Sequence, residues 1–316
     1  MNRLESMDSR GVDGGVPRRA LCAAAAIAAC AIALPLSSAA AQEAPDCVKG
    51  KERLDDGINK WNGKNGRDSV TGLRGRDHLN GHGGHDLING GRDNDVVEGG
   101  DGNDLLCGGR GGDLIRGGPG DDVVYGEEEN DRIIPGPGND KVLGSAGNDR
   151  IYGWGESHGE IVDDGIDILD GGFNDDIIEA GGADTLYGYT HNDILSTKMP
   201  LIAPAVMDGG GNDDIVYGSE VDDNITGGER LSGRDKLYGA GGNDTMSGAG
   251  NDDEVYGQLG DDDLSGADGF DFLDGGPGDD HCDGGDLRDM GHDCEGESSI
   301  ERHGGSPRAI PYSWGF

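Results

Sequence analysis

The sequence is poor in apolar, aromatic and basic residues. Hydrophobic residues make up 33% of the 316 positions and aromatic residues 5%, which is too little to build one large core of the ordinary globular kind. Lys and Arg number 25 against 63 Asp and Glu, for a formal net charge of -38. Such a surface repels nucleic acids and anionic membranes, so we expect neither as a partner. Cations are the natural ligands of this chain.

Proline is also scarce, with 11 residues, although Gly reaches 64. Collagen needs a period of three residues and abundant Pro, so a collagen-like structure is excluded. Low hydrophobicity combined with high net charge is typical of disordered chains. That alternative holds only if the Gly and Asp residues have no regular order.

The N-terminal region differs in composition from the rest. Arg18 and Arg19 precede an Ala-rich apolar run, residues 20–36, and small residues follow it. This order is typical of a secretory signal peptide, and the run is too short to span a membrane. We expect residues 1–41 to be cleaved and the mature chain not to insert into a membrane. A lipoprotein cleavage box ending at Cys30 is the alternative.

From residue 63 onward, Gly and Asp follow a nine-residue repeat. Asp recurs at every ninth position from Asp68 to Asp149 and again from Asp235 to Asp280, and an aliphatic residue stands two positions after nearly every Asp. The unit is G-G-x-G-x-D-x-U-x, where U is aliphatic. A disordered chain has no reason to keep a carboxylate and an aliphatic residue in phase. The pattern therefore indicates an ordered repeat fold.

The repeat has several irregularities. We expect the register to run on through a degenerate unit at 154–163, which has His158 in the Asp place, to Asp167 and Asp176. One residue is then lost before Asp184. An apolar segment, 197–208, interrupts the repeats; we expect an insertion loop packed on the fold, with contact to a partner as the alternative. The predicted organisation is a signal peptide (1–41), an N-terminal cap (42–62) that contains a worn repeat, a first block (63–196), the insertion (197–208), a second block (209–283), and a C-terminal cap and tail (284–316).

Each part of the unit has an expected conformation. The three residues x-U-x suit a short strand with one side chain inward, and the six Gly-rich residues suit a tight turn with positive φ. Two units then form one flattened coil, and stacked coils pair as parallel strands around a narrow aliphatic core. We predict an all-β fold, a parallel β-roll of the β-helix solenoid type.

The same geometry aligns carboxylates in rows. Asp residues 18 positions apart, such as Asp104 and Asp122, would lie one coil apart, at about 4.7 to 4.9 Å. Without counterions, neighbours would repel by roughly 3 to 4 kcal/mol at an effective dielectric of 20. Ca²⁺ suits this spacing, because its oxygen ligands lie at about 2.3 to 2.6 Å and turn carbonyls can complete its shell. Mg²⁺ demands a tighter octahedron, and Zn²⁺ prefers N and S ligands.

The repeats resemble the RTX, or hemolysin-type, calcium-binding nonapeptide repeats over residues 63–283. The resemblance implies a β-roll in which repeat Asp residues and turn carbonyls hold several Ca²⁺ ions between adjacent loops, with folding that waits for the ion. With an N-terminal signal peptide and no catalytic domain, the chain is similar to the small secreted stand-alone proteins of that superfamily. The Asp residues expected to bind calcium are Asp86, Asp95, Asp104, Asp113, Asp122, Asp131, Asp140, Asp149, Asp176, Asp214, Asp223, Asp244, Asp253, Asp262, Asp271 and Asp280.

Some units depart from the family pattern. Arg67 and Arg76 precede the first two repeat Asp residues, Asp68 and Asp77, where later units have Asn or Asp. In other units, Glu129, Glu156, His191 and Val221 replace the Gly at the fourth position. We expect such changes to weaken calcium binding.

Four cysteines follow the predicted cleavage site. An even count in an exported chain is typical of disulfides, and four cysteines allow three pairings. Cys282 stands in the inward aliphatic place of the last regular unit, and Cys294 follows it by twelve positions. We expect the two to pair as a clamp on the last coil. Cys47 and Cys107 then remain for each other, and free thiols are the alternative.

Two further motifs favour no separate chemistry. Residues 155–159 match the G-x-S-x-G nucleophile elbow, but they lie in a degenerate repeat without the sheet and helix that an elbow needs. His78, His82 and His85 occupy three different repeat positions, so we do not expect them to converge on a transition metal.

The sequence as a whole predicts a secreted, extracellular calcium-binding β-roll with a structural or binding role, and not an enzyme. Two other classes stay open. An accessory or degenerate module of a secreted hydrolase would need a catalytic module, for which few residues remain beside the repeats. A surface adhesin would need a cell-surface or protein partner, which the sequence does not identify.

Overall fold

The computed structural model describes residues 51–157, 160–162, 165–181, 183–197, 203–228, 233–285, 289–294, 296–298 and 300–302, all within the compact unit Glu43–Phe316. The predicted signal peptide and Cys47 lie outside the described residues. The described residues form strands and turns without any helix. Accordingly, none of them belongs to a helix that could cross a membrane.

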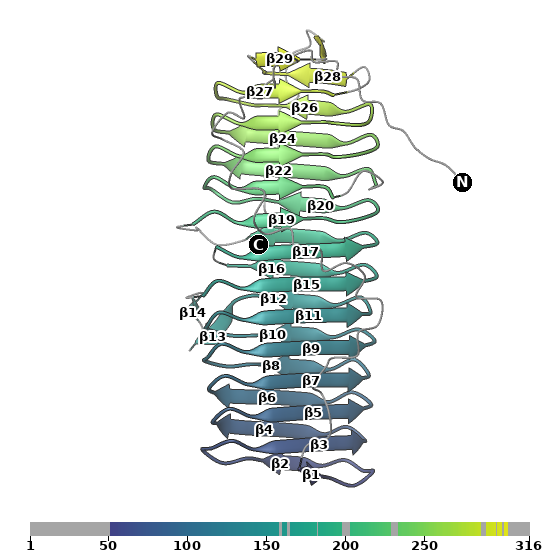
Figure 1. Ribbon diagram of the computed structural model, residues 1–316, viewed down its shortest axis with the longest axis vertical. Helices are drawn as coiled ribbons and strands as arrows, with labels where there is room; N and C mark the ends of the chain where they lie inside the picture. Colours follow the sequence, from purple (N-terminus) through teal and green to yellow (C-terminus); the bar gives the residue numbers. More distant parts are fainter. Residues whose placement is uncertain are drawn as a thin grey trace, which may run out of the picture. The chain divides into compact units, whose positions relative to one another are not determined.

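The described residues form two parallel sheets of fourteen strands each, and the strands of these two sheets alternate along the chain (Figure 1). The first sheet contains β1 (Glu52–Arg53), β3 (Ser69–Arg74), β5 (Leu87–Arg92), β7 (Leu105–Arg110), β9 (Val123–Glu128), β11 (Lys141–Ala146), β15 (Ile168–Phe173), β17 (Thr185–Thr190), β19 (Val206–Asp208), β21 (Asn224–Thr226), β23 (Thr245–Ser247), β25 (Asp263–Ser265), β27 (His281–Asp283) and β29 (Gly296–Ser298). The second sheet contains β2 (Lys60–Asn62), β4 (His78–Gly83), β6 (Val96–Asp101), β8 (Leu114–Arg116), β10 (Arg132–Ile134), β12 (Arg150–Tyr152), β16 (Ile177–Ala180), β18 (Ile194–Thr197), β20 (Ile215–Tyr217), β22 (Lys236–Gly241), β24 (Glu254–Leu259), β26 (Phe272–Asp274), β28 (Asp289–His292) and β30 (Ile300–Arg302). The predicted β-roll is confirmed.

The aliphatic residue of each unit forms the core. Ile88 of β5 pairs in register with Leu106 of β7, which pairs in turn with Val124 of β9. All three side chains are fully buried, as are their counterparts in the second sheet. Because one coil comprises two units, the inward residues of each sheet lie 18 positions apart. The core is therefore a narrow ladder between the sheets, and each coil is stabilised by its neighbours.

The turns need glycine at defined places. Gly102 has a φ of 126°, and a Cβ atom on it would overlap the carbonyl oxygen of Gly84 in the preceding coil. Gly99, the first residue of the same unit, lies against the carboxylate of Asp104, and a Cβ atom there would collide with Oδ2. The first Gly of the unit thus leaves room for the carboxylate, and the fourth allows adjacent turns to stack closely.

The degenerate unit at 154–163 is not a coil of the roll. Its strands β13 (Gly155–Ser157) and β14 (Glu160–Val162) pair with each other as an antiparallel hairpin. The coils on either side pair directly, so that β11 contacts β15 and the register spacing there is 27 residues instead of 18. The sequence prediction that the register passes through this unit was wrong. The nine residues that this unit adds between Asp149 and Asp167 are looped out. The unit offers the roll neither an Asp nor an inward aliphatic residue, because His158 and Glu160 stand in those places.

The predicted insertion loop, 197–208, contains a repeat unit. Strand β19 pairs with β17 and β21, and Met207 is fully buried in the aliphatic ladder. Ala205 stands in the Asp place of this unit, where its backbone N–H donates to Asp223. The prediction of a loop over this whole segment was therefore wrong, because replacing Asp by Ala conceals the unit in the sequence.

The roll also extends beyond both predicted boundaries. Strands β1 and β2 precede residue 63, and Trp61 pairs with Leu79 as the worn repeat predicts. At the other end, β28, β29 and β30 continue the two sheets past residue 283. The segments predicted as caps thus supply the terminal coils of the sheets.

Candidate calcium sites

The repeat carboxylates form two ladders. The first ladder precedes the strands of the first sheet and consists of Asp68, Asp86, Asp104, Asp122, Asp140, Asp167, Asp184, Ala205, Asp223, Asp244, Asp262 and Asp280. The second ladder precedes the strands of the second sheet and consists of Asn59, Asp77, Asp95, Asp113, Asp131, Asp149, Asp176, Asp193, Asp214, Asp235, Asp253, Asp271 and Asp289.

We call each position of a ladder a rung. Backbone hydrogen bonds connect successive rungs of each ladder. The N–H of one rung donates to Oδ1 of the next Asp at 2.7 to 3.0 Å, as from Asp86 to Asp104 and from Asp95 to Asp113. The connection persists where the chain between rungs is longer, as from Asp140 to Asp167. One carboxylate oxygen is therefore used by the backbone, and Oδ2 is left for another partner.

In most rungs Oδ2 is buried and accepts no hydrogen bond. The carboxylates are nearly inaccessible; Asp122, for example, is 1% exposed. A buried carboxylate oxygen without a donor is costly, and a cation held between the coils would compensate for it. The rungs that share this arrangement are Asp77, Asp86, Asp95, Asp104, Asp113, Asp122, Asp131, Asp149, Asp176, Asp193, Asp214, Asp244, Asp253, Asp262, Asp271 and Asp289.

The burial also changes the acidity of these groups. Desolvation, together with the neighbouring carboxylates of the same ladder, raises the pKa of Asp122 to about 8 and that of Asp131 to about 9. The pKa of Asp113 rises to about 7, again mainly because of desolvation. In this fold a charged carboxylate at these places needs a positive partner.

Three rungs of the first ladder differ, because their own turn satisfies Oδ2. Asp68 accepts a hydrogen bond from the N–H of Lys64 at 2.6 Å. Asp184 accepts one from the N–H of Gly181 at 3.2 Å. Asp223 accepts two from Ser219, one from the N–H at 2.7 Å and one from Oγ at 2.9 Å.

The conformation four positions before the Asp explains the difference. Gly100, four before Asp104, has a φ of 107°, and its N–H donates to the carbonyl of Gly117 in the next coil. Ser219, four before Asp223, is not in the positive-φ region. Its N–H turns inward to the carboxylate of its own unit. The backbone of this residue therefore decides whether Oδ2 is available to an ion.

The structure places all sixteen predicted Asp ligands on the two ladders. Asp223 departs from the expectation, because its Oδ2 is already engaged by Ser219. Asp77 and Asp193 are not among the sixteen, because Arg76 and His191 depart from the family pattern in their units. Both nevertheless have the arrangement of the other buried rungs. In the unit of Asp193, both Tyr189 and His191 adopt positive φ, so the turn keeps its shape without glycine.

Sequence reasoning also missed Asp289. It follows Asp280 by nine positions, so the spacing alone could have identified it. Gly291 in its aliphatic place hid the unit. In the structure, Oδ1 of Asp289 accepts the N–H of Asp271 at 3.0 Å, and its Oδ2 is buried without a donor.

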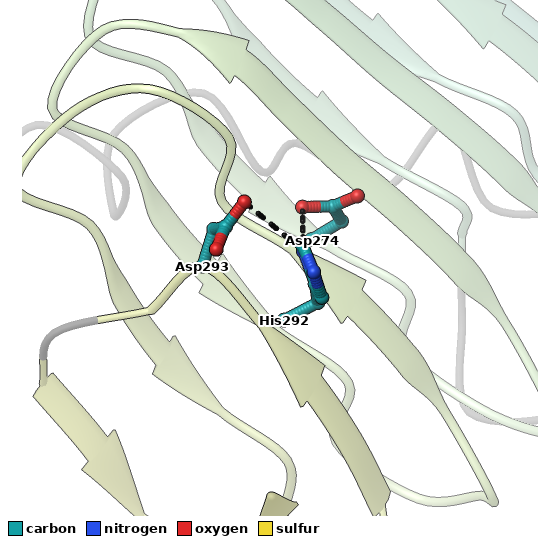
Figure 2. A group of neighbouring side chains, drawn as sticks. All are labelled: Asp274, His292 and Asp293. Carbon is teal, nitrogen blue, oxygen red and sulfur yellow. Dashed lines mark hydrogen bonds and ion pairs between the residues drawn. The ribbon is translucent and has the colours of Figure 1, made fainter. Parts of the chain in front are cut away.

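Two of the early histidines, His78 and His85, contact different partners. His78 lies with Nε2 3.3 Å from a carboxylate oxygen of Glu98, while Nδ1 of His85 contacts the backbone of Asn103. Among the described residues, a different group has three metal-type ligands within 4.8 Å of one another, namely Asp274, His292 and Asp293 (Figure 2).

Figure 2 shows His292 between the two carboxylates. Its Nδ1 lies 3.2 Å from Asp274 and 3.1 Å from Asp293. Asp274 and His292 are register partners on β26 and β28, so the sheet itself brings them together. The contact between His292 and Asp274 connects two successive strands of the second sheet near the C-terminal end of the roll.

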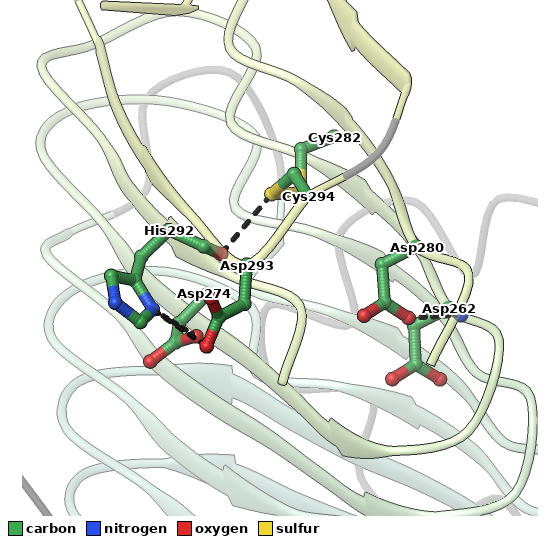
Figure 3. The surroundings of a disulfide bond; sticks show 7 residues. All are labelled: Asp262, Asp274, Asp280, Cys282, His292, Asp293 and Cys294. Carbon is green, nitrogen blue, oxygen red and sulfur yellow. Dashed lines mark hydrogen bonds and ion pairs between the residues drawn. A yellow bond between two sulfur atoms is a disulfide. The ribbon is translucent and has the colours of Figure 1, made fainter. Parts of the chain in front are cut away.

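The C-terminal cysteines lie beside this cluster (Figure 3). Cys282 and Cys294 are bonded, with a Cα to Cα distance of 5.9 Å. Cys282 is fully buried in the aliphatic ladder, where it pairs with Leu264, as its position in the repeat predicts. Cys107 is buried in β7 and disulfide-bonded. Its predicted partner, Cys47, lies outside the described residues.

The chain matches one known family of repeats. The profile of the RTX calcium-binding nonapeptide repeat matches residues 62–97, 83–115, 98–133, 108–142, 134–156, 181–197, 231–255 and 256–290. The chain belongs to this repeat family. The RTX resemblance predicted from the nonapeptide is confirmed, and the cation that suits the buried carboxylates is calcium. No curated protein matches the chain.

Proposed function

We propose that this RTX protein is exported, folds on Ca²⁺, and serves a structural or binding role outside the cell. The supporting observation is the pair of buried carboxylate ladders, in which Oδ1 of each typical rung accepts a backbone N–H and Oδ2 accepts no hydrogen bond. Calcium binds oxygen ligands from carboxylates and backbone carbonyls, and both are present in the turns of these rungs.

The residues that would hold the ions are the rungs whose Oδ2 is buried without a donor. In the first ladder they include Asp86, Asp104 and Asp122, and in the second Asp95, Asp113 and Asp131. Bound calcium would neutralise the charge that burial disfavours. The turn backbone holds each carboxylate in place through the hydrogen bond to Oδ1, and the first Gly of each unit keeps space beside Oδ2.

A structural role agrees with the sequence-based prediction that the protein is not an enzyme. The roll is a structural calcium-binding fold. In the G-x-S-x-G segment, Ser157 belongs to an antiparallel hairpin strand instead of the strand-to-helix turn that presents a nucleophile. His158 lies outside the described residues.

Export rests on the predicted signal peptide and the cysteines. Sequencing the N-terminus of protein purified from the culture medium should give a chain that begins at Gln42. Protein confined to the cell, or a lipid-modified Cys30, would contradict the proposed route.

Calcium binding is tested by native mass spectrometry of the full mature chain. After dialysis against Ca²⁺, we expect a series of masses corresponding to many bound ions, all removed by chelator. A mass that stays that of the ion-free chain in millimolar calcium would contradict the proposal. Mg²⁺ at the same concentration is the control, and we expect few ions to be retained from it.

A further inference from the structure

The first ladder is interrupted near its middle. Ala205 occupies a rung, as its backbone shows: its N–H donates to Oδ1 of Asp223 at 2.8 Å, and its carbonyl accepts the N–H of Asn224. The N–H of Val206 donates to the carbonyl of Asp184, so the stacking of coils continues through this point. The rung has no carboxylate, although the roll is unbroken.

The two rungs that flank Ala205 are satisfied by their own turns. Asp184, on one side, accepts the N–H of Gly181, and Asp223, on the other, accepts the N–H and Oγ of Ser219. None of these three consecutive rungs of the first ladder therefore offers a cation an Oδ2 atom that is free of a hydrogen-bond donor. In contrast, the next rung, Asp244, has its Oδ2 buried without a hydrogen bond.

The second ladder is continuous through the same coils. Asp176, Asp193 and Asp214 are connected rung to rung by hydrogen bonds of 2.8 Å, and the Oδ2 atoms of all three are buried without a donor. The difference between the two edges is thus local. Successive turns along the chain belong alternately to the first and the second ladder, so one ladder can be interrupted while the other continues.

We propose that the turns of Asp184, Ala205 and Asp223 form a calcium-free gap, so that this part of the roll binds calcium along the second ladder alone. The gap divides the ions of the first ladder into an N-terminal set, which includes those at Asp86, Asp104 and Asp122, and a C-terminal set that begins at Asp244. This inference rests on the proposed calcium binding and adds which turns the ions avoid.

The gap has a structural consequence. At the rungs whose Oδ2 accepts no hydrogen bond, the bound ion neutralises the carboxylate. At Asp223, two hydrogen bonds from Ser219 stabilise the carboxylate instead. The two sets of the first ladder are separated by three coils that share no ions along that edge. Calcium bound at Asp122 and calcium bound at Asp244 are therefore coupled only through the second ladder and the core.

The test compares two buried rungs that follow one another along the chain, Asp214 and Asp223. Each is replaced by Asn, which keeps the size of the side chain and an oxygen that accepts the ladder hydrogen bond. Native mass spectrometry of the full mature chain in calcium counts the bound ions. We expect Asp214→Asn to lose at least one ion relative to wild type and Asp223→Asn to lose none.

The outcomes separate the two proposals. Equal loss of ions from both variants would overturn the gap while supporting calcium binding by the ladders. No loss from Asp214→Asn would contradict the calcium site at that rung and hence the proposed function. Circular dichroism in calcium verifies that each variant folds.

A second measurement needs no variant. Crystals of the calcium-loaded wild-type protein, measured for calcium anomalous scattering, should show peaks in the turns of Asp214 and Asp244. The turns of Asp184, Ala205 and Asp223 should show none. A calcium peak in any of these three turns would overturn the gap.

Discussion

The backbone N–H of Asp104 donates a 2.7 Å hydrogen bond to Oδ1 of Asp122, one coil further along the first ladder. The bond fixes the carboxylate while Oδ2 stays buried without a donor. Repeated along both edges of the roll, this arrangement stacks negative charge in a desolvated place. The fold alone does not compensate for this charge, and the following predictions test whether calcium does.

Removal of calcium should unfold the roll. In excess chelator we expect the mature protein to lose most of its β-structure at neutral pH, because each buried rung must then either keep an uncompensated charge or take up a proton. Titration with calcium should restore the structure cooperatively, at about 10⁻⁴ to 10⁻³ M as in other extracellular calcium modules. Circular dichroism measures the transition, and a fully formed roll in excess chelator would contradict it.

Substitution should affect the rungs unequally. Replacing Asp104 and Asp122 together by Ala should reduce the number of bound ions, because both have an Oδ2 without a donor. Replacing Asp68 should leave that number unchanged, since Lys64 already donates to its Oδ2. Isothermal titration calorimetry compares the two proteins. Equal losses would show that the hydrogen bond from Lys64 does not exclude the ion.

Acid should partly replace calcium. The folded pKa is about 8 for Asp95 and Asp122 and about 9 for Asp131, above the value of about 3.9 for an unfolded chain. A raised pKa means that protonation stabilises the fold, fully below pH 4 and progressively less as the pH rises through 8 to 9. In chelator, β-structure should therefore increase as the pH is lowered from 9 to 4.

Calcium affinity should change in the opposite direction over the same range. The ion and the protons compete for the same carboxylates, so the affinity should fall as the pH is lowered. Calcium titrations at several pH values, followed by circular dichroism, measure this. An affinity that does not vary between pH 9 and pH 5 would show that the buried rungs do not bind the ion.

A glycine pair tests the turn geometry. Gly102→Ala should destabilise the calcium-loaded roll by at least about 1 to 3 kcal/mol, because Ala is strained at positive φ and its Cβ would overlap the carbonyl of Gly84. Gly83→Ala is the control, since its Cβ would lie 3.7 Å from Asp101 at ordinary contact distance. Denaturant unfolding in calcium compares them. Equal stability would show that the turn can move to accept the methyl group.

The bond between Cys282 and Cys294 should protect the end of the roll. A disulfide that closes a loop of this size contributes roughly 3 kcal/mol in the chain-entropy picture. Reduction should therefore raise the calcium needed to protect residues 262–283 from hydrogen exchange more than for residues 104–149, which have coils on both sides. Mass spectrometry measures the exchange. Unchanged C-terminal protection, or a peptide linking Cys282 to Cys47, would contradict the clamp.

The sequence by itself determined the repeat, the two-unit coil, the aliphatic core and nearly all rungs of the ladders. These features are periodic, so each unit supports the interpretation of the next. It also identified the worn repeat at Trp61 and the inward position of Cys282. Where a unit had lost its Asp, as at Ala205, or its aliphatic residue, as at Gly291, the pattern failed and the unit was missed.

Only the tertiary structure decided which units belong to the roll and which rungs are available to an ion. The degenerate unit at 154–163 leaves the roll as an antiparallel hairpin, and β11 pairs directly with β15 across it. Asp223 and Asp244 occupy equivalent places in their repeats, yet the N–H of Ser219 turns to its own carboxylate while Ala240 adopts a φ of 78°. The direction of that one N–H depends on the backbone of the stacked turns, and the repeat pattern does not encode it.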